Sequence, residues 1–175
     1  MSGMNCREKG MVISMETSSA GKKYGRHIVQ TDADYSLCAG CSGCELVCGL
    51  VHEGVAGLSV RRIFVDKDDT QLMHTVYTCQ HCEDRPCYNA CPRKGKAMCL
   101  DENNNIAYVN NEGCIGCGLC VKACPFEPKR ISLSKPKKGV ALKCDLCRTR
   151  SAGPACIEDC QVMCIRMSDA PVPGV

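Results

Sequence analysis

Cysteines are the residues of this sequence whose type and spacing could do chemistry. Nineteen of the 175 residues are cysteine, several times the ordinary share. Sixteen of them fall into four groups of four, and every group begins with two residues between thiols and ends with three. The groups are Cys38-x2-Cys41-x2-Cys44-x3-Cys48, Cys79-x2-Cys82-x4-Cys87-x3-Cys91, Cys114-x2-Cys117-x2-Cys120-x3-Cys124 and Cys144-x2-Cys147-x8-Cys156-x3-Cys160. This is an internal repeat along the chain.

The spacing is typical of iron–sulfur ligation. A C-x2-C-x2-C segment wraps three thiolates around one cluster, because two intervening residues let the chain turn and present each sulfur inward. Groups one and three have this spacing, and Gly40, Gly43, Gly116 and Gly118 lie between their cysteines, where a missing Cβ lets the backbone approach closely. Each of the four groups contains all four of its cysteines. We therefore expect four [4Fe-4S] clusters rather than a mixture with [3Fe-4S].

Two other uses of so many cysteines are disulfides and zinc. A secreted disulfide scaffold fits poorly, because residues 1–20 lack the charged start and apolar run of a signal peptide and the odd cysteine count leaves one thiol over. Structural zinc usually takes two separated pairs of ligands, not four thiols in one short segment. A zinc-bound structural module remains the alternative, and it would be colourless where an iron–sulfur protein is brown.

The composition favours a fold that depends on metal. Trp is absent, and 2 Phe and 5 Tyr supply little aromatic packing, so we expect an apoprotein that is largely disordered. No stretch approaches the roughly 20 apolar residues of a membrane span. We expect a cytoplasmic chain without a direct membrane span.

The charge balance argues against nucleic-acid binding. The formal net charge is +3, but four clusters that each carry about −2 with their thiolates would bring it to about −5. The basic stretches around Arg93, Lys135 and Arg148 are then expected to be solvated faces, with docking of an acidic partner as the second interpretation.

Short β-prone stretches and helical turns alternate with the cysteine groups. We expect strands over 27–30, 59–65, 75–78, 106–110, 130–133 and 140–143, and helices over 45–52, 118–123 and 155–167. The sequence predicts a small α+β fold built twice, rich in loops, with short β-hairpins and short helices around the clusters.

The four groups resemble those of the four-cluster ferredoxin-like electron-transfer subunits of molybdenum and tungsten oxidoreductases, hydrogenases, formate hydrogenlyase and carbon monoxide dehydrogenase systems. The likeness covers about residues 34–167. The segment from Cys79 to Cys87 and the long gap from Cys147 to Cys156 are especially similar. Departures are Gly49 and Gln161, where proline often follows the fourth cysteine, and Arg85, which replaces a frequent proline.

The resemblance implies a swap of fourth ligands between paired groups. The implied ligand sets are Cys38, Cys41, Cys44 with Cys160; Cys144, Cys147, Cys156 with Cys48; Cys79, Cys82, Cys87 with Cys124; and Cys114, Cys117, Cys120 with Cys91. The resemblance thus implies two tandem bacterial-ferredoxin-like modules, the first comprising residues 27–58 and 139–167 and the second 59–138. Residues 1–26 would form a flexible or partner-wrapping arm, and 168–175 a tail.

Three further cysteines and one histidine lie outside the ligand sets. We expect Cys6, Cys99 and Cys164 to be small buried or idle thiols. His81, between Cys79 and Cys82, is expected to be partly exposed, with tuning of a cluster as the alternative.

The sequence offers no substrate site: it has no recognisable nucleophile–base pair, nucleotide-binding glycine loop or flavin signature. We expect a chain that is not an enzyme by itself and that relays single electrons between a large catalytic subunit and a flavin, NAD or ferredoxin redox partner. The resemblance favours a tungsten or molybdenum-pterin enzyme of the aldehyde:ferredoxin oxidoreductase family, including the benzoyl-CoA reductase type. The alternatives are a formate dehydrogenase, hydrogenase or carbon monoxide dehydrogenase partner, or a free polyferredoxin.

Overall fold

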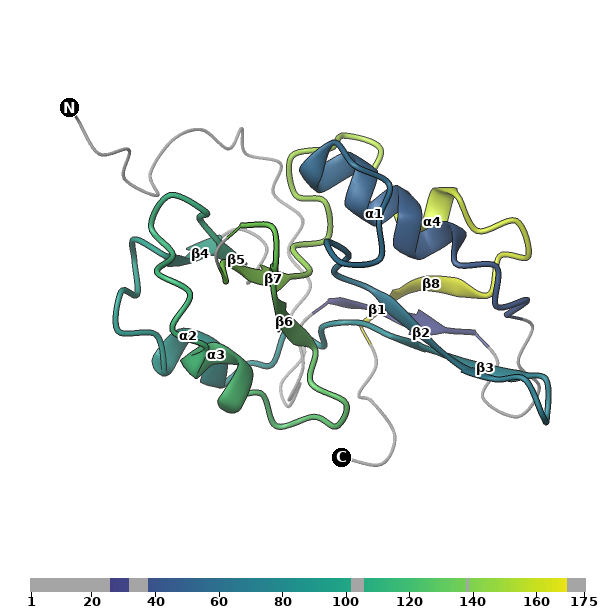
Figure 1. Cartoon of the computed structure of the whole chain (residues 1–175), viewed down its shortest axis with the longest axis horizontal. Helices are drawn as coiled ribbons and strands as arrows, with labels where there is room; N and C mark the ends of the chain where they lie inside the picture. Colours follow the sequence, from purple (N-terminus) through teal and green to yellow (C-terminus); the bar gives the residue numbers. More distant parts are fainter. Residues whose placement is uncertain (1–25, 32–37, 102–105, 138, 170–175) are drawn as a thin grey trace.

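The computed structural model describes residues 26–31, 38–101, 106–137 and 139–169. Short strands and helices alternate within these ranges, joined by loops (Figure 1). They are β1 (His27–Gln30), α1 (Gly43–Glu53), β2 (Phe64–Asp68), β3 (Met73–Tyr77), α2 (Pro86–Asn89), β4 (Met98–Asp101), β5 (Ile106–Val109), α3 (Leu119–Lys122), β6 (Ile131–Leu133), β7 (Ala141–Lys143), α4 (Ala155–Glu158) and β8 (Ile165–Ser168). The expected small, loop-rich α+β structure is confirmed. Cys6, nearly all of the expected arm and most of the tail lie outside the described residues.

Every sheet in the described ranges is a two-stranded antiparallel ribbon. β2–β3, β4–β5 and β6–β7 are formed by strands adjacent in sequence, whereas β1 pairs with β8 from the other end of the chain. In that ribbon Ile28 lies opposite Met167 and Gln30 opposite Ile165. A single two-stranded ribbon is marginally stable in water, so these sheets depend on what they pack against.

The elements gather in two halves (Figure 1). One half holds α1 packed on α4, with β1, β8 and the β2–β3 hairpin below them; the other holds α2 packed on α3, with β4 to β7. The expected modules stay a prediction, and two contacts join segments that it assigns to different modules. β7 pairs with β6 of the second half, and β3 packs beside β1 of the first, because strand pairing crosses the points where the sequence pattern changes.

Cysteine sulfur makes up much of the buried interior. Seven of the twelve residues in the largest buried cluster are cysteines, and the remainder are isoleucines and Leu146. A smaller cluster in the other half holds Cys87 and Cys120 beside Met98, Ala107 and other short side chains. The interior is therefore arranged around thiols rather than around a continuous aliphatic core.

Helix α1 is held by one buried carboxylate. Glu45, 2% exposed, accepts a hydrogen bond from the Val65 backbone N–H at 3.1 Å and pairs with Arg61 at 2.7 Å. The helix ends at Gly54, whose left-handed backbone (φ 70°) lets its N–H bond to the Leu50 carbonyl. Among the described residues, no helix has the length and apolar character to cross a bilayer.

One expected helix is wrong. The segment 155–167 is helical only over α4, and residues from Ile165 onward form strand β8. Met163 has a positive φ of 49°, which reverses the chain, and the alternation of buried Ile165 with exposed Arg166 then suits the ribbon with β1. Strand β4 and helix α2 were not expected from the sequence, because their side chains lack a clear periodicity.

Close packing accounts for Gly49 in place of proline. Gly49 lies inside α1, where proline would remove a helical hydrogen bond. A Cβ there would stand 2.8 Å from the Val55 carbonyl oxygen and 3.0 Å from that of Gly57. We expect Gly49→Ala to destabilise the protein by about 1–3 kcal/mol, because backbone must move.

The measurement for Gly49→Ala is the thermal unfolding midpoint under anaerobic conditions. Gly57→Ala is the matched control, since its Cβ would meet nothing closer than 3.9 Å. Equal midpoints for the two variants would contradict the close approach of α1 to the loop that contains Val55 and Gly57.

Candidate iron–sulfur centres

The same backbone turn occurs in all four cysteine groups. The residue before the second cysteine has a positive φ in each: 63° at Gly40, 47° at His81, 69° at Gly116 and 56° at Leu146. Side chains other than glycine rarely adopt this conformation. Because His81 and Leu146 adopt it too, the turn follows from what the loops surround rather than from local preference.

A second repeated feature begins the helix that carries each third cysteine. The N-cap, two residues before that cysteine, is left-handed at Ser42, Arg85 and Gly118, with φ of 62°, 45° and 74°. Proline cannot adopt such a φ, which explains Arg85 in its place. In group four the N-cap is Pro154, which is extended and follows the longer loop. Each helix then leads the fourth cysteine away from the first three.

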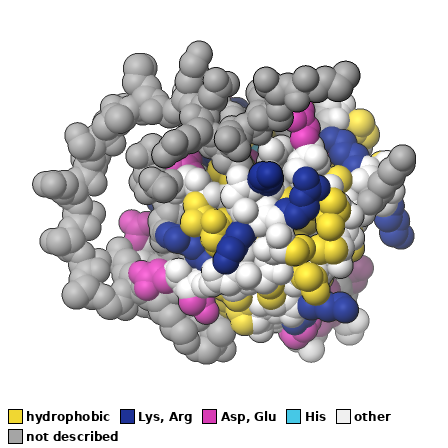
Figure 2. Space-filling model, turned by 90° about the vertical axis from the view of Figure 1, so that its left-hand side faces the viewer, with side chains coloured by type: hydrophobic (Ala, Val, Ile, Leu, Met, Phe, Trp, Pro, Cys, Tyr) yellow, Lys and Arg dark blue, Asp and Glu magenta, His cyan; other side chains and the backbone are white. Residues whose placement is uncertain are grey.

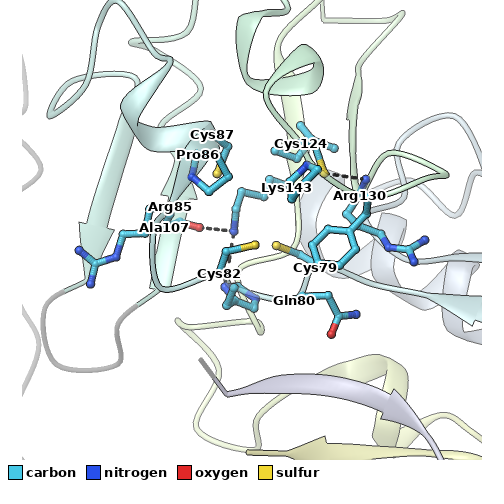
Figure 3. A pocket seen from close by; sticks show the side chains of 14 residues that line it. Cys79, Gln80, Cys82, Arg85, Pro86, Cys87, Ala107, Cys124, Arg130 and Lys143 are labelled. Atoms are coloured by element: carbon cyan, nitrogen blue, oxygen red, sulfur yellow. Dashed lines mark hydrogen bonds between the residues drawn. The ribbon is translucent and has the colours of Figure 1, made fainter. Parts of the chain in front are cut away.

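Three hollows are each lined by three cysteines of one group and the fourth cysteine of another, and one of them is also lined by Cys164. Figure 3 shows one of them, where Cys79, Cys82 and Cys87 of group two meet Cys124 of group three. This hollow and the one lined by Cys114 and its neighbours contain similar space, about 400 and 380 Å³ including the part open to solvent. The hollow lined by Cys38, Cys41, Cys44 and Cys160 is larger, about 570 Å³ on the same measure.

The remaining four predicted ligands also lie together. Burial raises the pKa of Cys156, and the charges of Cys48 and Cys147 raise it further. Burial and then the charge of Cys156 raise the pKa of Cys144. All four are buried. The structure thus brings the sixteen cysteines together in the four sets that the ligand swap implies, and their ligation of iron stays a prediction.

We name the four sets by letters. Quartet A is Cys38, Cys41, Cys44 and Cys160; quartet B is Cys48, Cys144, Cys147 and Cys156; quartet C is Cys79, Cys82, Cys87 and Cys124; quartet D is Cys91, Cys114, Cys117 and Cys120.

The thiols fit an anionic iron–sulfur cofactor. Burial, followed by neighbouring acidic groups, raises the pKa of Cys44 and of Cys82 to about 12, so these sulfurs need a metal to hold them as thiolates. Backbone N–H groups already point at quartet sulfurs: that of Arg62 at Cys48 Sγ and that of Arg130 at Cys124 Sγ, both at 3.4 Å. Such donors stabilise negative charge on ligating sulfur.

The sequence matches a known family over residues 70–170, that of the 4Fe-4S dicluster domain. The matched segment is more than half of the chain and contains groups two, three and four. The chain belongs to the 4Fe-4S dicluster family. The dicluster name gives two clusters, so a total of four stays a prediction.

Relatives match most of this dicluster chain. YsaA of Escherichia coli, whose name proposes a role in electron transport, is 38% identical over 144 residues, 78% of this chain and 87% of YsaA. The polyferredoxin-like subunit of an aliphatic sulfonate oxidoreductase from Pyrococcus furiosus is 41% identical over 123 residues, 70% of this chain and 66% of its own. The thiosulfate reductase electron transfer subunit PhsB of Salmonella typhi is 36% identical over 137 residues, 73% of this chain and 68% of PhsB.

Among solved structures, the active site complex BamBC of benzoyl coenzyme A reductase has a chain that aligns over 86% of this chain and 79% of its own length. The identity is 22% and the TM-score is 0.47.

The quartets of this dicluster chain are neighbours in the order A, B, C, D. The charge of Cys44 in quartet A helps to raise the pKa of Cys156 in quartet B, after burial and closer cysteines. Cys79 of quartet C likewise helps to raise the pKa of Cys144 in quartet B, and Cys87 of quartet C that of Cys120 in quartet D, in each case after burial. The sequence order of the groups differs, because group four returns beside group one.

The outer quartets reach the surface and the inner ones do not. Of the sixteen quartet cysteines, Cys41 of quartet A and Cys117 of quartet D are exposed. All of quartet B is buried, and quartet C is buried except for the half-buried Cys82.

A buried lysine beside quartet C was not anticipated from the sequence. Lys143 is 1% exposed, and its Nζ donates to the Ala107 carbonyl at 2.5 Å and the Cys144 carbonyl at 3.1 Å. His81 Nδ1 lies 3.5 Å from that Nζ, and His81 is 4% exposed, so the expectation of a partly exposed histidine is wrong. The one sequence signal is a lysine that ends a short apolar strand directly before a ligand cysteine.

The cysteines outside the quartets have different positions. Cys164 is buried, with its Sγ 3.6 Å from Cys160 Sγ, and burial raises its pKa to about 12. Cys99 is fully buried in β4. The expectation of a small buried thiol is confirmed for Cys164, whereas Cys99 is disulfide-bonded, so the expectation of a thiol there is wrong.

Proposed function

We propose that this chain is an electron-transfer subunit that relays single electrons through four [4Fe-4S] clusters between a catalytic oxidoreductase subunit and a second redox partner. The observation that carries the proposal is the order of the quartets. Four neighbouring cysteine sets form a row whose two outer members each have an exposed cysteine, while its inner members are buried. Such a row has two points of access and a protected interior.

The chain's own residues hold and shield the cofactors. When bound, a [4Fe-4S] cluster takes up and gives up one electron at a potential set by its surroundings. The thiolates fix the four positions, and the backbone N–H groups directed at Cys48, Cys114, Cys124 and Cys144 favour negative charge there. Burial of quartet B excludes water from the middle of the row.

The two ends of the row differ in surface chemistry. Around Cys117 the exposed apolar side chains Ile115 and Leu119 accompany Arg93, which lines the quartet D hollow. Figure 2 shows apolar and basic side chains next to one another on this side of the molecule. At the other end Asp159 lines the quartet A hollow. Different charges at the two ends support two different partners.

The names of relatives support a catalytic partner. The Pyrococcus furiosus relative is a subunit of an oxidoreductase, and PhsB is an electron transfer subunit of a reductase. The resemblance of the cysteine pattern favours a tungsten or molybdenum-pterin enzyme of the aldehyde:ferredoxin oxidoreductase family as that partner. A formate dehydrogenase, hydrogenase or carbon monoxide dehydrogenase is the second candidate.

The test is anaerobic purification of the tagged full chain from its native host. We expect a brown complex that contains a larger subunit with tungsten or molybdenum and about sixteen irons per copy of this chain. We also expect that dithionite reduces the chain and that the substrate of the partner reoxidises it. Elution of a fully loaded monomer without a partner would indicate a free polyferredoxin, and a colourless protein loaded with zinc would refute electron transfer.

A further inference from the structure

The most unusual buried group outside the ligands is the Lys143 ammonium. Its hydrogen-bond partners are two backbone carbonyls, an imidazole and the Cys79 sulfur, and of these only the sulfur can carry a negative charge. Burial holds the pKa of His81 well below its usual value, and the charge of Lys143 lowers it further, so this imidazole accepts as a neutral ring. A buried cation without an anion beside it is strongly unfavourable.

The anions that compensate Lys143 are cysteine sulfurs. Within the described ranges, no Asp or Glu forms an ion pair with it. Lys143 lines the quartet C hollow together with Cys79, Cys82, Cys87 and Cys124. Figure 3 shows its amine among the cysteines of quartet C.

Lys143 also lies at the joint between the two halves. It ends β7, bonds to β5 through Ala107, and directly precedes Cys144 of quartet B. Cys79 and Cys87, which line the same hollow as Lys143, belong to quartet C. The Lys143 cation therefore lies between quartets B and C, close to both.

A second cation reinforces quartet C, whereas quartet A has the opposite charge beside it. Arg130 lines the quartet C hollow, and its guanidinium lies 4.2 Å from the centre of the Tyr77 ring. At quartet A, the Asp159 carboxylate lines the hollow, and the nearby Glu45 is paired with Arg61 at 2.7 Å.

We propose that Lys143, assisted by Arg130, makes quartet C the site of highest reduction potential in the row, above quartet A, whose hollow is lined by the Asp159 carboxylate. Reduction adds one negative charge, which a nearby cation stabilises and a nearby carboxylate opposes. An electron delivered by one redox partner would then occupy the quartet C cluster until the other partner accepts it. The inference rests on the proposed function, since it requires clusters at both quartets.

The experiment is an anaerobic redox titration of the iron-loaded full chain, followed by electron paramagnetic resonance. The signal of quartet C is identified by its loss in Cys82→Ala. We measure the ratio of reduced to oxidised quartet C cluster at the midpoint potential of the wild-type cluster. In Lys143→Met we expect this ratio to fall at least tenfold. For a one-electron couple, a tenfold change corresponds to a midpoint potential lower by 59 mV. Lys143→Arg keeps the charge and should stay within threefold of wild type. Lys67→Met, which removes an exposed lysine on β2, is the control for net charge.

Arg130→Gln is the second variant, and it tests the proposal even if Lys143→Met loses its iron. This variant retains the backbone N–H to Cys124 and removes only the guanidinium, so the same signal should shift in the same direction by a smaller factor. If Lys143→Met binds its full complement of iron and the quartet C potential is unchanged, the proposal is overturned. If Lys143→Met does not bind iron, an unchanged quartet C potential in Arg130→Gln overturns it. A wild-type protein that binds no iron would instead refute the proposed function.

Discussion

Removal of iron from the anaerobic holoprotein by a chelator is expected to unfold most of the chain. The sheets of the described ranges are separate two-stranded ribbons, each marginal alone, and seven of twelve residues in the largest buried cluster are cysteines. Without metal these thiols gain no ligand bonds, so the free energy of metal binding is lost from the free energy of folding. The radius of gyration should rise from about 16 Å, that of a compact chain of 175 residues, toward about 44 Å.

Small-angle scattering and far-ultraviolet circular dichroism measure this loss. Reloading with ferrous iron and sulfide should restore the compact state, whereas zinc alone should not. A chelated protein that keeps its dichroism and its small radius would show that the fold does not depend on metal.

Paired cysteine substitutions are expected to reveal which thiols share a cluster. Cys82 and Cys124 lie 42 positions apart in sequence but line one hollow, whereas Cys117 and Cys124 belong to one sequence group but different quartets. Each single alanine variant should lose about four of about sixteen irons. Cys82→Ala with Cys124→Ala should lose no more than either alone, because both changes disable the same site. Cys117→Ala with Cys124→Ala should lose about eight.

Iron content per chain after anaerobic purification is the measurement. Cys164→Ala is the matched control, because this thiol is as buried as the ligands but lies outside the quartets; its iron content should equal that of wild type. The opposite pattern, with the larger loss in the Cys82 and Cys124 pair, would disprove the ligand swap.

Several features of the fold could be predicted from local sequence. Strands β1, β5, β6 and β7 and helices α1 and α3 lie where short apolar runs or helical turns flank the cysteine groups. Strand β8 could not be predicted in this way, because its partner β1 lies about 140 residues earlier and its own residues also suit a helix. Pairing with a distant strand overrides a weak local preference.

The sequence by itself indicated which thiols would lie together. Spacings of two and three residues allow few turns of the backbone, so they define the four groups. The exchange of fourth ligands between groups came from the resemblance. Only the tertiary structure decided the row from quartet A to quartet D, the exposure of Cys41 and Cys117 and the burial of Lys143. These depend on how α1 packs on α4 and how β7 lies beside β5, which are contacts between residues far apart in the chain. Residue spacing constrains only neighbours in sequence, whereas burial and the resulting charge environment come from the packing of the two halves.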